Sequence, residues 1–216
     1  QSPIPNPQSP IPIILLYIVS LFIFCKINFF ILIISIMSMK LNISIFGEKD
    51  IGKTTLINDY ININNFQKKE KAGHISFSKS FRDGNSMKLY LYEFSNIPTN
   101  KKDIVSNQCI IIMFDMTSRS SFEQVLNEWI KFLKEIKYNN SIILFGTKKF
   151  NEDEKRLPKT DEQEITELIE TAKIKGKFYD IMDKNQKEKT DLIDSLIESS
   201  YEDVKNNINK KDCIIF

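Results

Sequence analysis

One run of residues in the chain has types and spacing suited to binding a nucleoside triphosphate. Residues 47–54 read Gly-Glu-Lys-Asp-Ile-Gly-Lys-Thr and match the pattern G-x-x-x-x-G-K-[ST]. The two glycines let the backbone wrap around phosphates, so that its N–H groups and the following helix N-terminus point at the anion. Lys53 would reach the β- and γ-phosphates, and the Thr54 hydroxyl would be a ligand of Mg²⁺.

Two residues in the middle of this loop are unusual for such a site. Small residues usually stand there and let the loop close on the γ-phosphate, whereas this chain has Lys49 and Asp50. The Asp50 carboxylate would repel the phosphates unless it points to solvent, and Lys49 would partly compensate for it. The residues expected to contact the nucleotide here are Gly47, Asp50, Ile51, Gly52, Lys53, Thr54 and Thr55.

The elements that must position this loop are short apolar runs, typical of strands, alternating with helical segments. The loop lies between a predicted strand over 40–46 and a predicted helix over 53–64. An Asp-Gly turn between the runs 74–81 and 87–94 predicts a β-hairpin. Further strands are predicted over 108–115, 141–146 and 177–182, and further helices over 120–137, 160–173 and 188–205. This order predicts a three-layer α/β fold with a six-stranded, mainly parallel sheet and one antiparallel edge strand.

A capping box, Ser120-Ser121-Phe122-Glu123, is expected to open the helix over 120–137.

The composition of the chain excludes some classes of function. Lys and Arg number 30 against 28 Asp and Glu, a net charge of +2, so no nucleic-acid partner is expected. The three cysteines are far apart in the sequence and there is one histidine, which excludes a disulfide framework and a Cys/His zinc cluster.

The first 38 residues differ from the rest of the chain. Residues 11–36 are almost entirely apolar and long enough to span a bilayer, although Lys26 near the middle would cost about 2.5–3.5 kcal/mol on insertion scales. Lysines follow this segment and none precedes it, so a spanning helix would leave the later residues in the cytosol. The alternative is that residues 1–38 are untranslated upstream sequence or part of a fragmentary gene model, because the chain starts with Gln and Met37 and Met39 precede the globular part.

The order of elements and the loop together resemble a Ras-superfamily small GTPase, most closely the Rab branch, over residues 39–216. The resemblance also rests on the apolar run Ile110–Asp115, the Asp-x-Thr turn after it and the Ser-Phe-Glu start of the next helix. Trp129 resembles the tryptophan of the corresponding Rab helix, displaced by one residue. The resemblance implies a P-loop NTPase G-domain over 39–206 that binds GTP or GDP with Mg²⁺.

The tail over 207–216 ends in Cys213-Ile-Ile-Phe, a C-a-a-X box of the geranylgeranyl type. One prenyl chain binds membranes only marginally, and Lys210 and Lys211 offer a small second signal. We therefore expect lipidation of Cys213 and attachment to the cytoplasmic face of an intracellular membrane or the plasma membrane. We also expect a monomer with effector or regulatory proteins as partners.

The two switch motifs of the family are degraded in this chain. Lys71 or Ala72 stands where the first switch carries a threonine that binds Mg²⁺ and senses the γ-phosphate. The second switch should read Asp-x-x-Gly-Gln, and here it reads Glu-Phe-Ser-Asn-Ile over 93–97. Glu93 would still hold Mg²⁺ through a water, whereas Ile97 cannot orient an attacking water as the family glutamine does.

The guanine-reading motif is degraded as well. Thr147-Lys148-Lys149-Phe150 stands where the family has Asn-Lys-x-Asp. The Lys148 stem can still cover the base, but Phe150 cannot accept hydrogen bonds from guanine, and Asp153 is out of register. Thr147 and Lys148 remain candidate nucleotide contacts.

Three functions are open at this point. The first is a divergent, prenylated, Rab-like GTP-binding protein of membrane traffic or signalling with slow or absent hydrolysis. The second is a pseudo-GTPase that serves as a binding platform without turnover. The third is another P-loop enzyme such as a small nucleotide kinase, which is the weakest because three scattered arginines offer no phosphoryl clamp. The sequence leaves open whether the chain is an enzyme.

Overall fold

The structure is a computed structural model, and it describes residues 20–26, 40–71, 73–147, 163, 165–167, 170 and 176–212. The chain divides into two compact units, residues 1–39 and residues 40–216. In the first unit, the described residues 20–26 are helical, and Leu21, Phe22, Ile23 and Phe24 are exposed. Among the described residues, no helix has the length and apolar character needed to cross a membrane.

Within the described part of the second unit, one seven-stranded sheet has the order β2-β3-β4-β1-β5-β6-β7. β1 pairs in parallel with β4 and β5, and the parallel pairing continues through β6 to β7. β3 is antiparallel to both β4 and β2. The bounds are β1 Lys40–Gly47, β2 Lys69–Lys71, β3 His74–Ser80, β4 Ser86–Phe94, β5 Cys109–Asp115, β6 Ser141–Thr147 and β7 Gly176–Asp180.

The prediction of an α/β fold with a mainly parallel sheet is confirmed, but the predicted strand count of six is wrong for the described residues. The additional strand is β2, whose three residues Lys-Glu-Lys are all exposed. Such a strand has no apolar face, so nothing in its sequence distinguishes it from a loop. It adds a second antiparallel pairing at the edge of the sheet.

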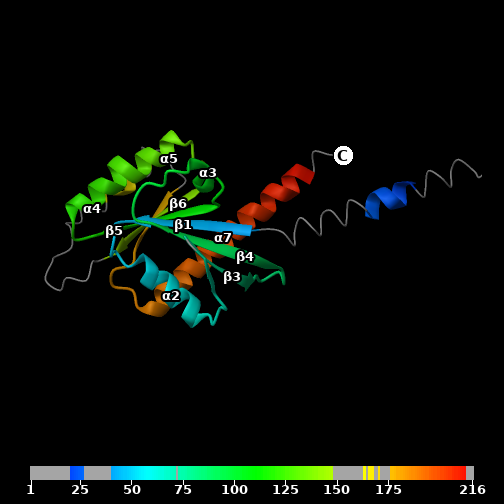
Figure 1. Cartoon of the computed structure of the whole chain (residues 1–216), viewed down its shortest axis with the longest axis horizontal. Helices are drawn as coiled ribbons and strands as arrows, with labels where there is room; N and C mark the ends of the chain where they lie inside the picture. The colour runs from blue at the N-terminus through cyan, green and yellow to red at the C-terminus, as the bar shows by residue number, and fades with distance from the viewer. Residues whose placement is uncertain are drawn as a thin grey trace, which may run out of the picture. The chain divides into compact units, whose positions relative to one another are not determined.

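Helices lie on both sides of this sheet (Figure 1). On one side α2 and α7 lie together, and the Tyr60 hydroxyl of α2 donates to Asp194 of α7 over 2.7 Å. On the other side lie α3, α4 and α5. The bounds are α2 Lys53–Ile63, α3 Lys101–Val105, α4 Arg119–Gln124, the π-helix η1 Val125–Ile130, α5 Lys131–Glu135 and α7 Gln186–Asp212. The predicted helix over 160–173 lies mostly outside the described residues.

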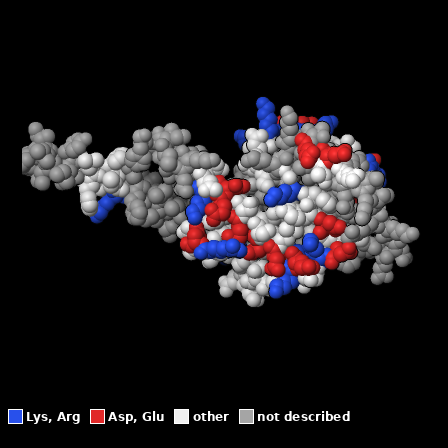
Figure 2. All heavy atoms as spheres, turned by 180° about the vertical axis from the view of Figure 1, so that it is seen from behind, with Lys and Arg blue, Asp and Glu red and all other residues white. Residues whose placement is uncertain are grey.

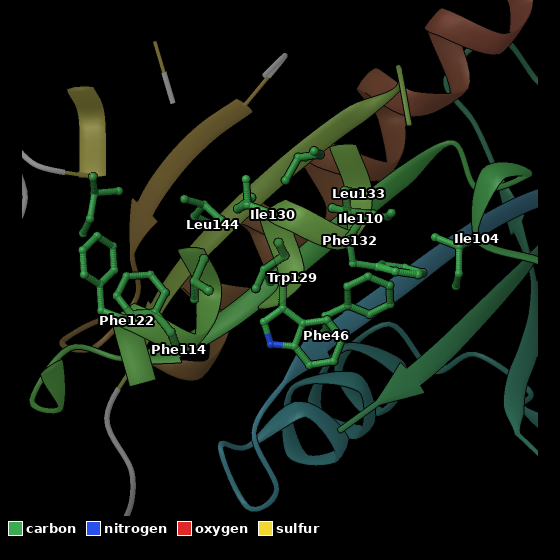
Figure 3. Close-up of a cluster of buried hydrophobic side chains, with 14 of the residues drawn as sticks. Phe46, Ile104, Ile110, Phe114, Phe122, Trp129, Ile130, Phe132, Leu133 and Leu144 are labelled. Carbon is green, nitrogen blue, oxygen red and sulfur yellow. The ribbon is translucent and has the colours of Figure 1, made fainter. Parts of the chain in front are cut away.

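The buried cluster between the sheet and η1 fixes the strand that leads into the loop. The Trp129 ring stacks on the Phe46 ring with centroids 4.7 Å apart, and the Phe94 ring meets Phe46 edge-on at 5.4 Å. Figure 3 shows Trp129 against Phe46, with Phe114 beside Phe122 further along the same side of the sheet. The last side chain before Gly47 is thereby held by packing on two sides.

The helical segment that carries Trp129 is not a regular α-helix. Residues 125–130 form a π-helix, in which each turn takes an extra residue compared with an α-helix. Trp129 lies in this segment and is buried in the core.

The predicted capping box at Ser120 is wrong, because the N-cap is Ser118. Ser118 is extended (φ −123°, ψ 112°) and its hydroxyl accepts from the Ser121 N–H over 3.4 Å.

The surface seen in Figure 2 carries acidic and basic side chains interspersed, with Asp and Glu gathered in several small patches. This agrees with the near balance of the two signs in the sequence.

Candidate phosphate and magnesium site

The loop between β1 and α2 is shaped by its two glycines. Gly47 has a φ of 149°, and a Cβ on it would lie 2.4 Å from the carbonyl oxygen of Met113, so no larger residue fits there. Gly52 is the N-cap of α2 in the left-handed region with a φ of 94°, and no side chain caps the helix. The first N–H groups of α2 therefore receive no side-chain acceptor from the cap residue, which leaves the helix terminus suited to an anion.

Lys53 places a buried cation over this loop. Its side chain is 5% exposed, and its ammonium group donates to the carbonyl oxygens of Gly47 over 2.9 Å and of Glu48 over 2.6 Å. Such charge-assisted bonds fix the position of the ammonium group before any phosphate arrives. The ammonium group that is expected to meet the β- and γ-phosphates is therefore held against the backbone of the loop.

Thr54 and Glu93 come together although they are far apart in the sequence. The Thr54 hydroxyl donates to Glu93 Oε2 over 2.7 Å. Glu93 reaches this position because β4 aligns it with Ile45 of β1, just ahead of the loop. Two neighbouring oxygen atoms are the hard ligands that Mg²⁺ prefers. The Thr54 hydroxyl oxygen could give a lone pair to the metal while its hydrogen stays in the hydrogen bond to Glu93. The residues present therefore fit the ion.

A cleft of about 430 Å³ opens over the loop. Its lining residues are Lys49, Asp50, Gly52, Lys53, Thr54, Thr55, Glu93 and Ser95. Asp50 has a φ of 63°, a conformation that Asp tolerates better than most residues, and its side chain is exposed. Among the described residues no group of three or more His, Cys, Asp or Glu could hold a metal. Magnesium in this cleft would therefore depend on phosphate oxygens for several of its ligands.

Five of the seven loop residues that were predicted to contact the nucleotide line this cleft. The other two, Gly47 and Ile51, lie close together in the loop, and Ile51 is buried. Thr147 ends β6, is largely buried and is not among the residues that line the cleft. Ser95 lines the cleft and was missed, although its position two residues after Glu93 was a signal. Lys148, Phe150 and Cys213 lie outside the described residues.

Glu93 and Ser95 of the second switch line the cleft, whereas Lys71 and Ile97 do not. Lys71 belongs to β2, where it pairs with His74, and it does not line the cleft; Ala72 lies outside the described residues. Ile97 is 40% exposed and also does not line it. The helix that follows, α3, has only five residues and is capped by Asn100.

Comparison with known proteins links the chain to one family. Residues 42–202 match the sequence model of the Ras family. The Ras-related protein RabV of Dictyostelium discoideum is 32% identical to the chain over 117 residues, which are 50% of this chain and 49% of that relative. The chain thus spans about half the length of the relative that it matches.

Proposed function

The chain belongs to the Ras family of small GTPases, and from this premise we propose that it is a Rab-like protein that binds GTP or GDP with Mg²⁺ and hydrolyses GTP very slowly or not at all. The observation that carries the proposal is the pairing of Thr54 with Glu93 beside the ammonium group of Lys53. These three side chains provide a cation for the phosphates and oxygen ligands for a metal in one cleft.

Each of these residues has a distinct part in the proposed binding. Lys53 neutralises charge on the β- and γ-phosphates, and the backbone N–H groups after Gly47 bind the phosphate oxygens. Thr54 supplies its hydroxyl oxygen to the metal, and Glu93 orients that hydroxyl and balances the ion's charge. When bound, Mg²⁺ would neutralise phosphate charge in the manner general to this class of site.

The set of residues that line the cleft supports the proposal of slow hydrolysis. Neither Lys71 nor Ile97 lines it, and neither carries a group that could replace a metal-binding hydroxyl or a water-orienting amide. A pseudo-GTPase that keeps its nucleotide and acts as a binding platform remains the second candidate. The five-residue α3 favours it, because a helix this short offers little structure that could rearrange with the third phosphate.

The membrane role is proposed from the tail and from the Rab-related match. We infer that Cys213 is prenylated and that the protein acts in membrane traffic or signalling at a cytoplasmic membrane surface. Cell fractionation tests this with the Cys213→Ser variant of the full chain. Transfer of the variant to the soluble fraction supports prenylation, whereas retention that resists carbonate extraction would show that residues 11–36 anchor the chain instead.

One titration tests the nucleotide proposal. The full chain is titrated with labelled GTP, GDP and ATP, with Mg²⁺ and with a chelator. We expect saturable binding that Mg²⁺ strengthens, and weak discrimination between guanine and adenine because Phe150 stands where the family has a carboxylate. No binding of any of the three nucleotides would contradict the proposal. Strong rejection of ATP would keep it but would show that another group, such as Asp153, recognises the base.

A further inference from the structure

The polar side chains that line the cleft over the loop differ in whether they already have a partner. Lys53 donates to two carbonyl oxygens of the loop, and Thr54 donates to Glu93. Lys49 and Ser95 line the same cleft. Within the part of the chain that the structure describes, neither of these two side chains makes a hydrogen bond or an ion pair. The cleft therefore offers a cation and a hydroxyl group that are available to a ligand.

Lys49 lies beside the fixed ammonium group of Lys53. The carbonyl oxygen of Glu48, the residue before Lys49, accepts a hydrogen bond from that ammonium group over 2.6 Å. Lys49 follows in the turn that it forms with Asp50, and its side chain is exposed. A lysine carries its charge on a flexible stem of four carbons, so its ammonium group can reach toward an anion in the cleft. The loop thus has a second cation close to the first.

Ser95 lies beside the pair of residues that would hold the metal. It comes two residues after Glu93, just beyond the end of β4 at Phe94, and it is half-buried. Alternate residues of an extended chain point to the same side and are about 7 Å apart. This spacing agrees with the place of both residues in the lining of the cleft. The Ser95 hydroxyl can donate a hydrogen bond to an oxygen of a ligand next to the metal position.

The engaged groups indicate where a third phosphate would lie. In sites of this class the loop lysine contacts the β- and γ-phosphates, and the metal ion lies between the same two phosphates. Lys71, which stands where the family has a metal-binding threonine, belongs to β2 and does not line the cleft. Thr55 lines it, but consecutive helix residues face different ways, so Thr55 does not share the side of Thr54 that meets Glu93. Lys49 and Ser95 remain for the outer side of the γ-phosphate.

The charges in the cleft favour the same assignment. Its lining residues include two cations, Lys49 and Lys53, and two carboxylates, Asp50 and Glu93. Lys53 is placed for phosphate groups that GTP and GDP have in common, and Glu93 is placed for the metal. GTP carries more negative charge than GDP. Among the residues that line the cleft, Lys49 is the cation left to offset that additional charge.

We propose that Lys49 and Ser95 recognise the third phosphate and give the chain a preference for GTP over GDP. Lys49 offsets the charge of this phosphate, and Ser95 donates its hydroxyl hydrogen to one of its oxygens. The inference rests on the proposed nucleotide function and deepens it. Recognition of the triphosphate is assigned to the loop and to the end of β4, and not to Lys71 or Ile97. The preference needs no hydrolysis, so it suits a chain that turns GTP over slowly or not at all.

The test compares GTP with GDP in isothermal titrations of the full chain with Mg²⁺. We expect wild type to bind GTP more tightly than GDP. Lys49→Ala should lose about five- to tenfold in affinity for GTP, less at high salt, and stay within about twofold for GDP. Lys49→Arg should retain the preference, and Ser95→Ala should lose about threefold for GTP alone. The matched control Lys131→Ala removes an exposed lysine of α5 and should change neither affinity.

A spectroscopic readout locates the contact. In the phosphorus NMR spectrum of GTP bound to the full chain, Lys49→Ala should shift the γ-phosphorus signal more than the α-phosphorus signal. Equal losses for GTP and GDP in Lys49→Ala, or a GTP preference that neither Lys49→Ala nor Ser95→Ala changes, would overturn the inference while leaving the nucleotide site in place. Binding of neither nucleotide by the wild type would overturn the proposed function, and this inference with it.

Discussion

The phosphate loop and the second switch lie next to each other at the ends of β1 and β4, yet their side chains are arranged for different tasks. In the loop, Lys53 is buried and fixed by two carbonyl oxygens. In the switch, Glu93 and Ser95 line the cleft over the loop, and Ile97 is exposed outside it. Under the proposed function, the chain keeps groups suited to phosphate and metal in the loop, whereas the second switch offers no side chain at Ile97 that could orient a water. The proposal thus separates holding a nucleotide from switching with it.

The largest effect is expected on the loop side of this comparison. Lys53→Ala removes the fixed ammonium group and should weaken nucleotide binding by about a hundredfold or more, since charge-assisted bonds to phosphate contribute about 1.5–3 kcal/mol each. Isothermal titration measures the loss. Lys49→Ala is the matched control, because Lys49 lines the same cleft from an exposed position. Equal affinity of the wild type and Lys53→Ala would mean that the loop does not bind phosphate as proposed.

The residues of the second switch predict a low rate of GTP hydrolysis. The purified chain should hydrolyse GTP no faster than about 10⁻⁴ per second, the intrinsic rate of a family member with intact switches. Ile97→Gln tests whether position 97 alone limits the reaction. We expect only a small gain, because Ile97 does not line the cleft and the first-switch hydroxyl is still missing. A single-turnover rate well above that limit in the wild type would show that the two regions still cooperate.

Glu93 joins the two regions, and its substitution sharpens the comparison. Glu93→Gln preserves shape but removes the charge beside Thr54, so affinity for Mg²⁺ in the nucleotide complex should fall about tenfold. Nucleotide binding in the presence of a chelator should change little, because Lys53 and the loop are untouched. The Mg²⁺ dependence of nucleotide release measures both values. A loss that is equal with and without metal would instead mean that Glu93 stabilises the loop itself.

How well each of these regions can be predicted from the sequence depends on whether neighbouring residues alone determine its structure. β1, the loop and α2 were predicted within about a residue because an apolar run, two glycines and a helix start succeed one another. β2 could not be predicted, because its pairing with β3 is the only reason that its polar residues are extended. The capping box failed because Ser118 and Ser120 are equivalent in type, and only the backbone shows which one is extended.

The candidate site shows the same limit at longer range. Residue types identified Lys53, Thr54 and Glu93, but the contact between Thr54 and Glu93 spans 39 residues and depends on the parallel register of β1 with β4. Ser95 was missed for the same reason, since its place in the cleft follows from where β4 ends. Local pattern thus indicated which groups could act, and the strand register determined which of them meet.

The smallest expected effect concerns Asp50, whose carboxylate would repel the phosphates that the loop is proposed to bind. Asp50→Gly relieves a left-handed backbone and removes a carboxylate from the cleft, so affinity for GTP should rise a few-fold. The gain should be larger for GTP than for GDP, which carries less negative charge, and should shrink at high salt because Asp50 is exposed. Asp50→Asn separates the two causes, since Asn tolerates the same backbone but carries no charge. A gain with Asn equal to that with Gly assigns the effect to charge, a gain with Gly alone assigns it to the backbone, and a loss with Asn would show that the carboxylate contributes to binding.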